Sequence, residues 1–199
     1  MPNARINVSF ATAARRLVAV VACCTLLTAC PPEGGRLAPV AGGDGSSRVV
    51  ARPEGEALEV AREGVKIIAG GRWSVADAAT SVILDVTNTN AEELTIDFGR
   101  AEVALGDAGQ RLTLRSLADE GAPGGPAAFL KERVVAVGGG RGNQFALEFR
   151  LDAGDGRMGV PRNVRGQVAT LRIPVEVRRA TPAQVDFVFE FKYSNYPER

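Results

Sequence analysis

The chain has 199 residues, with 24 Lys and Arg, 23 Asp and Glu, and no histidine, for a formal net charge of +1. The absence of histidine excludes Ser-His-Asp and Cys-His catalysis and the usual histidine zinc sites. The charge balance lacks the basic excess typical of nucleic-acid binding. We therefore expect no nucleic-acid partner, no cofactor, no metal site and no enzymatic activity.

The first 29 residues have the layout of a secretory signal. Arg5, Arg15 and Arg16 precede an apolar run over residues 17–29, and no acid occurs in this segment. A membrane-spanning helix needs about 20 apolar residues, and this run is shorter. The alternative, a buried N-terminal helix, fits less well, because paired arginines before an apolar run are typical of export. Without these residues, 21 basic and 23 acidic residues remain.

The apolar run ends in the sequence Leu27-Thr28-Ala29-Cys30. This sequence resembles the lipobox of bacterial lipoproteins, which implies cleavage before Cys30 and lipidation of its thiol. Cys23 follows a weaker version of the motif but would leave a shorter apolar run. The resemblance implies a lipid-anchored protein of the cell membrane, held firmly because lipoproteins carry several acyl chains. Pro31 stands where an aspartate would favour the inner membrane, so the outer membrane is favoured in a Gram-negative source.

Residues 30–55 are rich in Pro, Gly and Ser and contain few large apolar side chains. Such a segment buries too little surface to offset its ordering entropy. We therefore expect a lipidated flexible tether over residues 30–55, followed by one domain over residues 56–199.

From residue 58 onward, apolar side chains alternate with polar ones, as in half-buried strands. We expect an all-β, immunoglobulin-like antiparallel sandwich of about seven to nine strands. The best helical candidate is 127–131. Pro174 predicts an edge or bulged strand, and the apolar area of the final strand predicts a central position. The expected strands cover 58–60, 65–69, 82–87, 94–98, 101–105, 112–114, 134–137, 145–151, 171–178 and 185–193.

Residues 82–88, 94–98 and 105–109 resemble the first strands of the telokin-like, immunoglobulin-like domains of exported bacterial lipoproteins. The stretches "FALEFRL" and "VDFVFEFKY" resemble the later strands. The resemblance implies an immunoglobulin-like fold and brings no catalytic residue, because such domains are mainly of unknown function. The antibody pattern of two cysteines around a tryptophan is absent, and we expect Trp73 to be a core residue rather than a surface contact.

Two groups of acidic residues are candidate sites. Asp85 and Asp97 lie near the ends of strands expected to pair, and two carboxylates can hydrolyse glycosides. Both should face outward, however, so a surface role is favoured. Asp152 and Asp155 lie among glycines and could offer oxygen ligands to calcium, but the alternating acids and later Glu of a calcium loop are missing. The glycines at 138–140 lack the Lys and Ser or Thr of a phosphate-binding loop and predict a turn.

Arginines are in excess between residues 150 and 179. Arg150, Arg172 and Arg178 could contact an anionic envelope polymer or small ligand, because guanidinium binds phosphate and carboxylate bidentately. The alternative is a solvated face with cross-strand ion pairs. The leading hypothesis is a non-catalytic module that binds or scaffolds a protein partner through its loops and an exposed edge strand. The alternatives are the arginine-face binder and, least favoured, a carboxylate-dependent hydrolase.

Overall fold

The computed structural model describes residues 34–41, 47–74, 79–106, 110–121, 128–152, 158–159, 164–178 and 181–195. The chain divides into two units, Met1–Glu33 and Gly34–Arg199, and all of these residues belong to the second. The predicted signal segment 1–29 and Cys30 lie outside the described residues. No helix among the described residues has the length and apolar character needed to cross a membrane.

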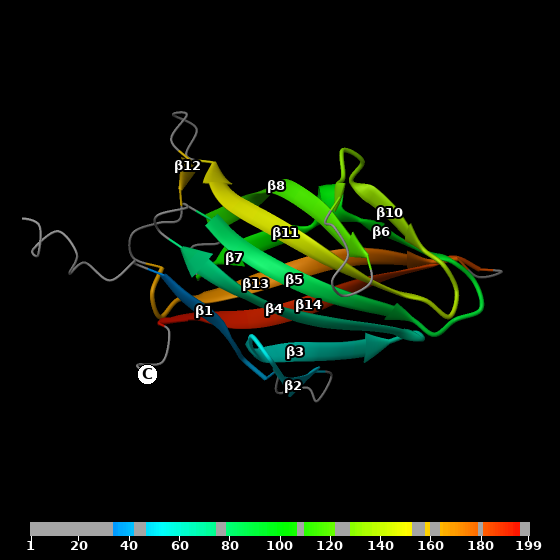
Figure 1. Ribbon diagram of the computed structural model, residues 1–199, viewed down its shortest axis with the longest axis horizontal. Coiled ribbons are helices and arrows are strands. Elements are labelled where there is room, and N and C mark those ends of the chain that lie inside the picture. The colour runs from blue at the N-terminus through cyan, green and yellow to red at the C-terminus, as the bar shows by residue number, and fades with distance from the viewer. Residues whose placement is uncertain are drawn as a thin grey trace, which may run out of the picture. The chain divides into compact units, whose positions relative to one another are not determined.

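In its described residues, the second unit consists of β-strands, their connections and one 3-10 helix, η1 (Phe98–Arg100), and every strand pairing described is antiparallel (Figure 1). The all-β prediction is confirmed. The strands are β1 (Gly34–Pro39), β2 (Ser47–Arg52), β3 (Gly55–Arg62), β4 (Val65–Ser74), β5 (Ala79–Asn88), β6 (Leu94–Asp97), β7 (Glu102–Leu105), β8 (Gln110–Gly121), β9 (Ala128–Phe129), β10 (Val134–Val137), β11 (Gly142–Asp152), β12 (Met158–Gly159), β13 (Val168–Val177) and β14 (Ala183–Asn195).

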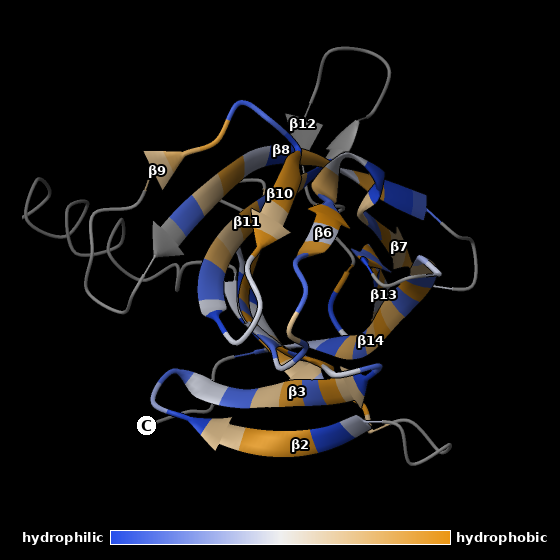
Figure 2. Cartoon of the chain, turned by 90° about the vertical axis from the view of Figure 1, so that its right-hand side faces the viewer, coloured by the Kyte–Doolittle hydropathy of each residue, from blue (hydrophilic) through white to orange (hydrophobic). Residues whose placement is uncertain are grey.

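Eight strands close into a ring in the order β1-β14-β13-β7-β8-β11-β5-β4, because β1 pairs with both β14 and β4. The β2–β3 hairpin continues from β4 outside this ring (Figure 2). Along β13, the neighbouring strand changes from β7 to β6, which also pairs with β10. Closure of the ring is a feature that the sequence analysis did not predict.

Alternate side chains fill the interior of the ring, as the period-two pattern predicts. Figure 2 shows the alternation of apolar and polar residues along the strands. The strand β14 contributes four large aromatic side chains to the interior and has a neighbour on each side, as does every strand of the ring. Trp73 is also buried, as expected. The interior residues of β14 are Phe187, Phe189, Phe191 and Tyr193.

Strand β1 closes the ring and corrects the predicted tether. Residues 34–39 and 47–52 form strands β1 and β2, so the folded unit begins at Gly34 rather than near residue 56. Leu37 points into the core. A Cβ at Gly35 would overlap the Ser194 carbonyl and the Trp73 indole nitrogen, and a Cβ at Gly34 would lie 2.8 Å from the Trp73 carbonyl oxygen. The glycines therefore serve close strand packing here rather than flexibility.

Two further predictions need correction. The predicted short helix at 127–131 is absent from its described part, since Ala128 and Phe129 form strand β9 against β8. The strand β13 is not an edge, because it pairs with β14 throughout and with β7 and β6 on its other side. Pro174 lies between the residues that pair with β7 and those that pair with β6. Its missing N–H therefore falls where the pairing on that side is interrupted.

The turn from β10 to β11, predicted from its glycines, is held by a buried asparagine. The Asn88 Nδ2 donates to the carbonyl oxygens of Glu92 at 2.8 Å and Val137 at 3.1 Å, and its Oδ1 accepts from the Asn90 amide at 3.0 Å. Gly140 adopts φ +66° within this turn. The Asn88 side-chain amide thus joins the connection between β5 and β6 to the turn between β10 and β11.

Near the closure, the Tyr193 hydroxyl and Thr80 Oγ1 share a buried hydrogen bond of 2.7 Å. The ring of Tyr193 packs edge-on against Trp73, with centroids 5.8 Å apart, and the Trp73 Nε1 donates to the Ser194 carbonyl at 3.0 Å. Burial raises the pKa of Tyr193 from 10.0 to about 12, and the bond to Thr80 opposes this only in part. The hydroxyl and indole groups at this end of the ring are therefore paired.

We predict that Tyr193→Phe and Thr80→Val each lower the free energy of unfolding by about 1–2 kcal/mol. Tyr193→Phe leaves the buried Thr80 hydroxyl without its partner, and Thr80→Val leaves the Tyr193 hydroxyl without its partner. The double variant should lose less than the sum, with a coupling of about 1 kcal/mol, since both partners are then removed. Urea unfolding followed by circular dichroism measures these values. Additive losses would contradict a direct bond.

The raised pKa of Tyr193 also predicts a loss of stability at high pH. Unfolded tyrosine ionises above pH 10, whereas the folded group keeps its proton until about pH 12. Unfolding therefore releases a proton in this window, and stability falls by roughly 2–3 kcal/mol between these values. The measurement is the difference between wild type and Tyr193→Phe in urea unfolding from pH 9 upward. An identical pH dependence of the two proteins would contradict the assignment.

Candidate functional site

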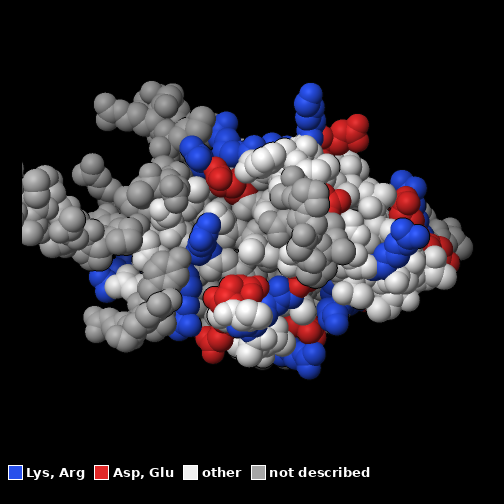
Figure 3. Space-filling view, in the orientation of Figure 1, with Lys and Arg blue, Asp and Glu red and all other residues white. Residues whose placement is uncertain are grey.

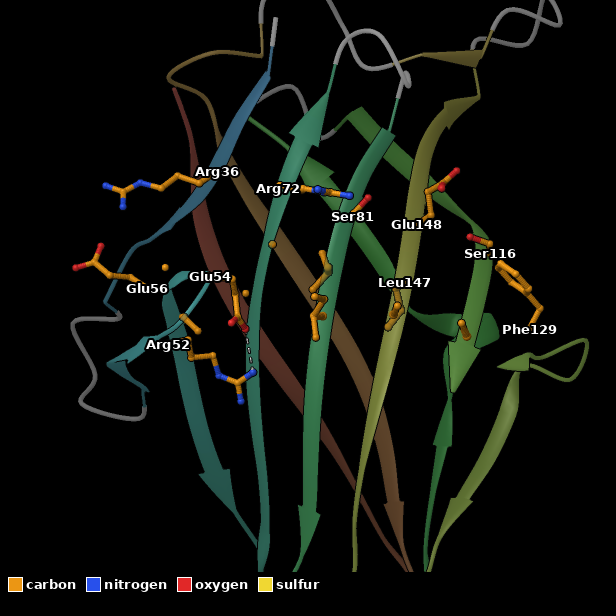
Figure 4. Close-up of a pocket in the computed structure, with 18 residues that line it drawn as sticks. Arg36, Arg52, Glu54, Glu56, Arg72, Ser81, Ser116, Phe129, Leu147 and Glu148 are labelled. Atoms are coloured by element: carbon orange, nitrogen blue, oxygen red, sulfur yellow. Dashed lines mark hydrogen bonds and ion pairs between the residues drawn. The ribbon is translucent and has the colours of Figure 1, made fainter. Parts of the chain in front are cut away.

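A groove of about 640 Å³ lies on the outer face of the ring, across strands β4, β5, β11 and β8 (Figure 4). Its floor is a row of apolar residues that are cross-strand neighbours, which we call the apolar row. Outward positions of an antiparallel sheet are normally polar, so this row departs from the pattern. The apolar row consists of Ala57 (β3), Gly70 (β4), Ile83 (β5), Ala146 (β11), Ala118 (β8) and Phe129 (β9).

The two ends of the apolar row differ. At one end, Ala57 is buried, and a Cβ on Gly70 would lie 3.2 Å from the Ala57 Cβ, so β3 and β4 pack closely. At the other end, Phe129 is 78% exposed, the most exposed of the large apolar residues described. Figure 4 places Phe129 at the far side of the groove from the β2–β3 hairpin. The groove thus ends at an aromatic ring in contact with solvent.

An ion-pair network holds the β2–β3 hairpin beside the groove. Arg52, which precedes the hairpin turn, forms an ion pair with Asp85 on β5 and lies 3.5 Å from a Glu54 carboxylate oxygen. The Gln144 Nε2 on β11 donates to Asp85 Oδ1 at 2.6 Å. Only 16% of the Arg52 side chain is exposed, so the pair is screened less than a surface pair. The network therefore joins the hairpin to two strands of the ring.

A polar row borders the apolar row on one side. Arg72, Ser81 and Glu148 are cross-strand neighbours in this row, and Figure 4 shows Arg72 extended toward Ser81. The Glu148 carboxylate accepts from Arg150 at 2.7 Å. Among the described residues, no acid forms an ion pair with Arg72. The Arg72 guanidinium therefore lies over the edge of the groove with its charge uncompensated by this part of the chain.

Arg36 also lines the groove, opposite Arg72 in the pairing of β1 with β4. Figure 4 shows its side chain directed away from the floor. Its Nε is buried without a hydrogen-bond partner among the described residues.

Elsewhere on the face in Figure 3, basic and acidic side chains are interspersed, without a broad patch of one sign.

The three arginines singled out in the sequence do not come together. Arg150 on β11 pairs with Glu148, Arg172 on β13 lies 3.7 Å from Asp186, and Arg178 lies 3.1 Å from Glu93. In the ring, β7 and β8 separate β13 from β11. Each arginine thus has its own acidic partner, and two strands of the ring separate Arg150 from the other two.

The disfavoured alternative, a carboxylate pair of Asp85 and Asp97, is not formed. Asp85 lies on β5, which pairs with β4 and β11, whereas Asp97 lies on β6, which pairs with β10 and β13. Asp97 accepts from the Gly99 amide at 3.0 Å and caps η1. Asp155 and the Asp152 side chain lie outside what the structure describes. Within the described ranges, no cluster of three or more metal-ligating side chains occurs.

The groove was missed because its residues look ordinary along the chain. Ile83 and Ala146 stand at outward positions of their strands, where the alternation predicts polar side chains. Only the pairing of β5 with β11 makes them neighbours. Apolar outward residues in two paired strands are the signal that could have indicated the groove.

No protein-family model matches the sequence, and no curated protein is similar to it.

Proposed function

We propose that the chain is a non-catalytic, lipid-anchored binding module of the cell envelope that holds a protein partner beside the membrane. The lipobox-like sequence ending at Cys30 supports the anchor. The observation that carries the binding role is the free edge of strand β2. The immunoglobulin-like relationship of the domain is part of this proposal, supported by the residues over 82–109 that resemble such domains.

The edge of β2 offers unpaired backbone groups. Among the described residues, β2 pairs only with β3. Pro53 and Glu54 form a two-residue turn, so Arg52 and every second residue before it bond to β3. The N–H and C=O groups of Val49 and Ala51 therefore point outward. Val49 is also 44% exposed, which gives a partner strand an apolar contact.

An edge strand of this kind binds an extended segment by adding it to the sheet. The Arg52–Asp85 ion pair holds the hairpin in place. A partner that binds the edge of β2 therefore loses less free energy to ordering of the hairpin. The alternatives have less support, because Arg150, Arg172 and Arg178 are paired separately and Asp85 does not face Asp97.

We predict that Ala51→Pro abolishes partner binding and leaves the fold intact, because proline removes an outward N–H without breaking the ladder to β3. The matched control is Ala51→Thr, which retains the N–H. The full-length variants are purified with their partners from chemically crosslinked envelopes, and their melting temperatures are compared. Recovery of the same proteins, in the same yield, with Ala51→Pro would contradict docking at this edge.

We predict that Cys30→Ser prevents lipidation, so the precursor is not trimmed before residue 30 and carries no acyl mass. Cys23→Ser is the control and should be processed normally. Mass spectrometry of the protein from membranes measures both outcomes. A normally acylated Cys30→Ser protein would exclude Cys30 as the anchor.

A further inference from the structure

The outer groove has the form of a ligand site that the edge-strand proposal does not use. Contiguous apolar residues exposed on a protein surface mark binding sites, whereas scattered ones do not. The apolar row crosses six strands, which is roughly 24 Å at the spacing of neighbouring strands. The volume of about 640 Å³ falls in the range of small-molecule sites.

The floor of the groove favours a hydrocarbon chain over a peptide. The backbone groups of β4, β5, β11 and β8 are used in pairing with their neighbours, and the side chains of the apolar row carry no donor or acceptor. A peptide lying along this row would leave its own N–H and C=O groups unpaired against the floor, which is costly. An alkyl chain has no such groups.

The width of the groove favours one chain rather than two. The apolar row is a single residue wide on β5 and β11, because Ser81 and Asp85 flank Ile83, and Gln144 and Glu148 flank Ala146. Side chains on the same face of a strand are about 7 Å apart. The apolar row between these polar residues is therefore wide enough for one alkyl chain.

The charge at the groove favours an acidic head. Arg72 has no acidic partner among the described residues, while the neighbouring Glu148 is neutralised by Arg150. A guanidinium binds a carboxylate through two parallel hydrogen bonds. Arg36 and Glu56 also line the groove, but Figure 4 shows both side chains directed away from its floor, so Arg72 is the cation placed to meet an acidic head.

We propose that the outer groove binds a single-chain fatty carboxylate. The carboxylate lies at Arg72 and Ser81, and the chain crosses Ile83, Ala146 and Ala118 toward Phe129. This binding is independent of partner docking, because the outward edge of β2 is not part of the groove.

Calorimetric titration with laurate below its micellar concentration tests the proposal. The protein is the 34–199 unit, which contains every described strand and the described core, and circular dichroism must first show that it is folded. Acetate tests the head alone, dodecyltrimethylammonium tests the tail with opposite charge, and dodecyl phosphate tests a phosphate head. Circular dichroism verifies that each variant is folded.

Two pairs of variants separate the tail from the head. Ala146→Trp fills the floor, and Thr170→Trp places the same side chain on the outer face of β13. Arg72→Gln removes the proposed cation, and Arg172→Gln removes the same charge elsewhere. We expect Ala146→Trp to abolish laurate binding and Arg72→Gln to weaken it about tenfold. Both controls should stay within about twofold of wild type, as should Ala51→Pro.

We expect no binding of acetate and at least tenfold weaker binding of dodecyltrimethylammonium. The proposal is overturned if folded wild type does not bind laurate, or if Ala146→Trp or Arg72→Gln binds it as wild type does. Equal affinity for the cationic amphiphile would also overturn it. Tighter binding of dodecyl phosphate than of laurate would replace the carboxylate by a lipid phosphate and so contradict the assignment.

Discussion

The pairing of β1 with both β14 and β4 is the constraint on which the rest of the structure depends. It closes the sheet and places Trp73 and Tyr193 inside one end of the ring. Close approach of the strands requires Gly34 and Gly35, because a side chain at either position would meet neighbouring backbone atoms. Once the sheet is closed, β1 and β4 no longer have free edges at this end, and the interior phenylalanines of β14 are shielded from water.

Closure also divides each strand into an inward and an outward set of residues. The inward set is apolar, as expected for a packed interior. The outward set is mainly polar, and along the apolar row six strands each contribute an apolar residue. The Arg52–Asp85 pair then fixes the β2–β3 hairpin beside this row. The free edge of β2 and the outer groove thus become two distinct contact surfaces on one rigid support.

The sequence predicted most strands after residue 58, because alternation in stretches such as 145–149 and 187–193 is regular, but it gave only 112–114 of β8 and a helix in place of β9. It failed for β1 and β2, because their Gly and Pro content suggested a tether although Leu37 and its neighbours form a strand of the ring. The candidate site fared worse. Arg150 is close in the sequence to Arg172 and Arg178 but lies two strands away from them, whereas Ile83 and Ala146 are distant in the sequence and adjacent in the sheet. Strand order decides such neighbours, and local patterns do not contain it.

Amide hydrogen exchange of residues 34–39 in the full-length protein tests the closed ring most directly. If β1 pairs with β14 and β4, the amides of this segment that take part in pairing should exchange as slowly as those of β14, because both belong to the same cooperative core. Exchange of the whole segment at the rate of an unstructured peptide, with β14 still protected, would show that the residues form a tether and that the ring is open.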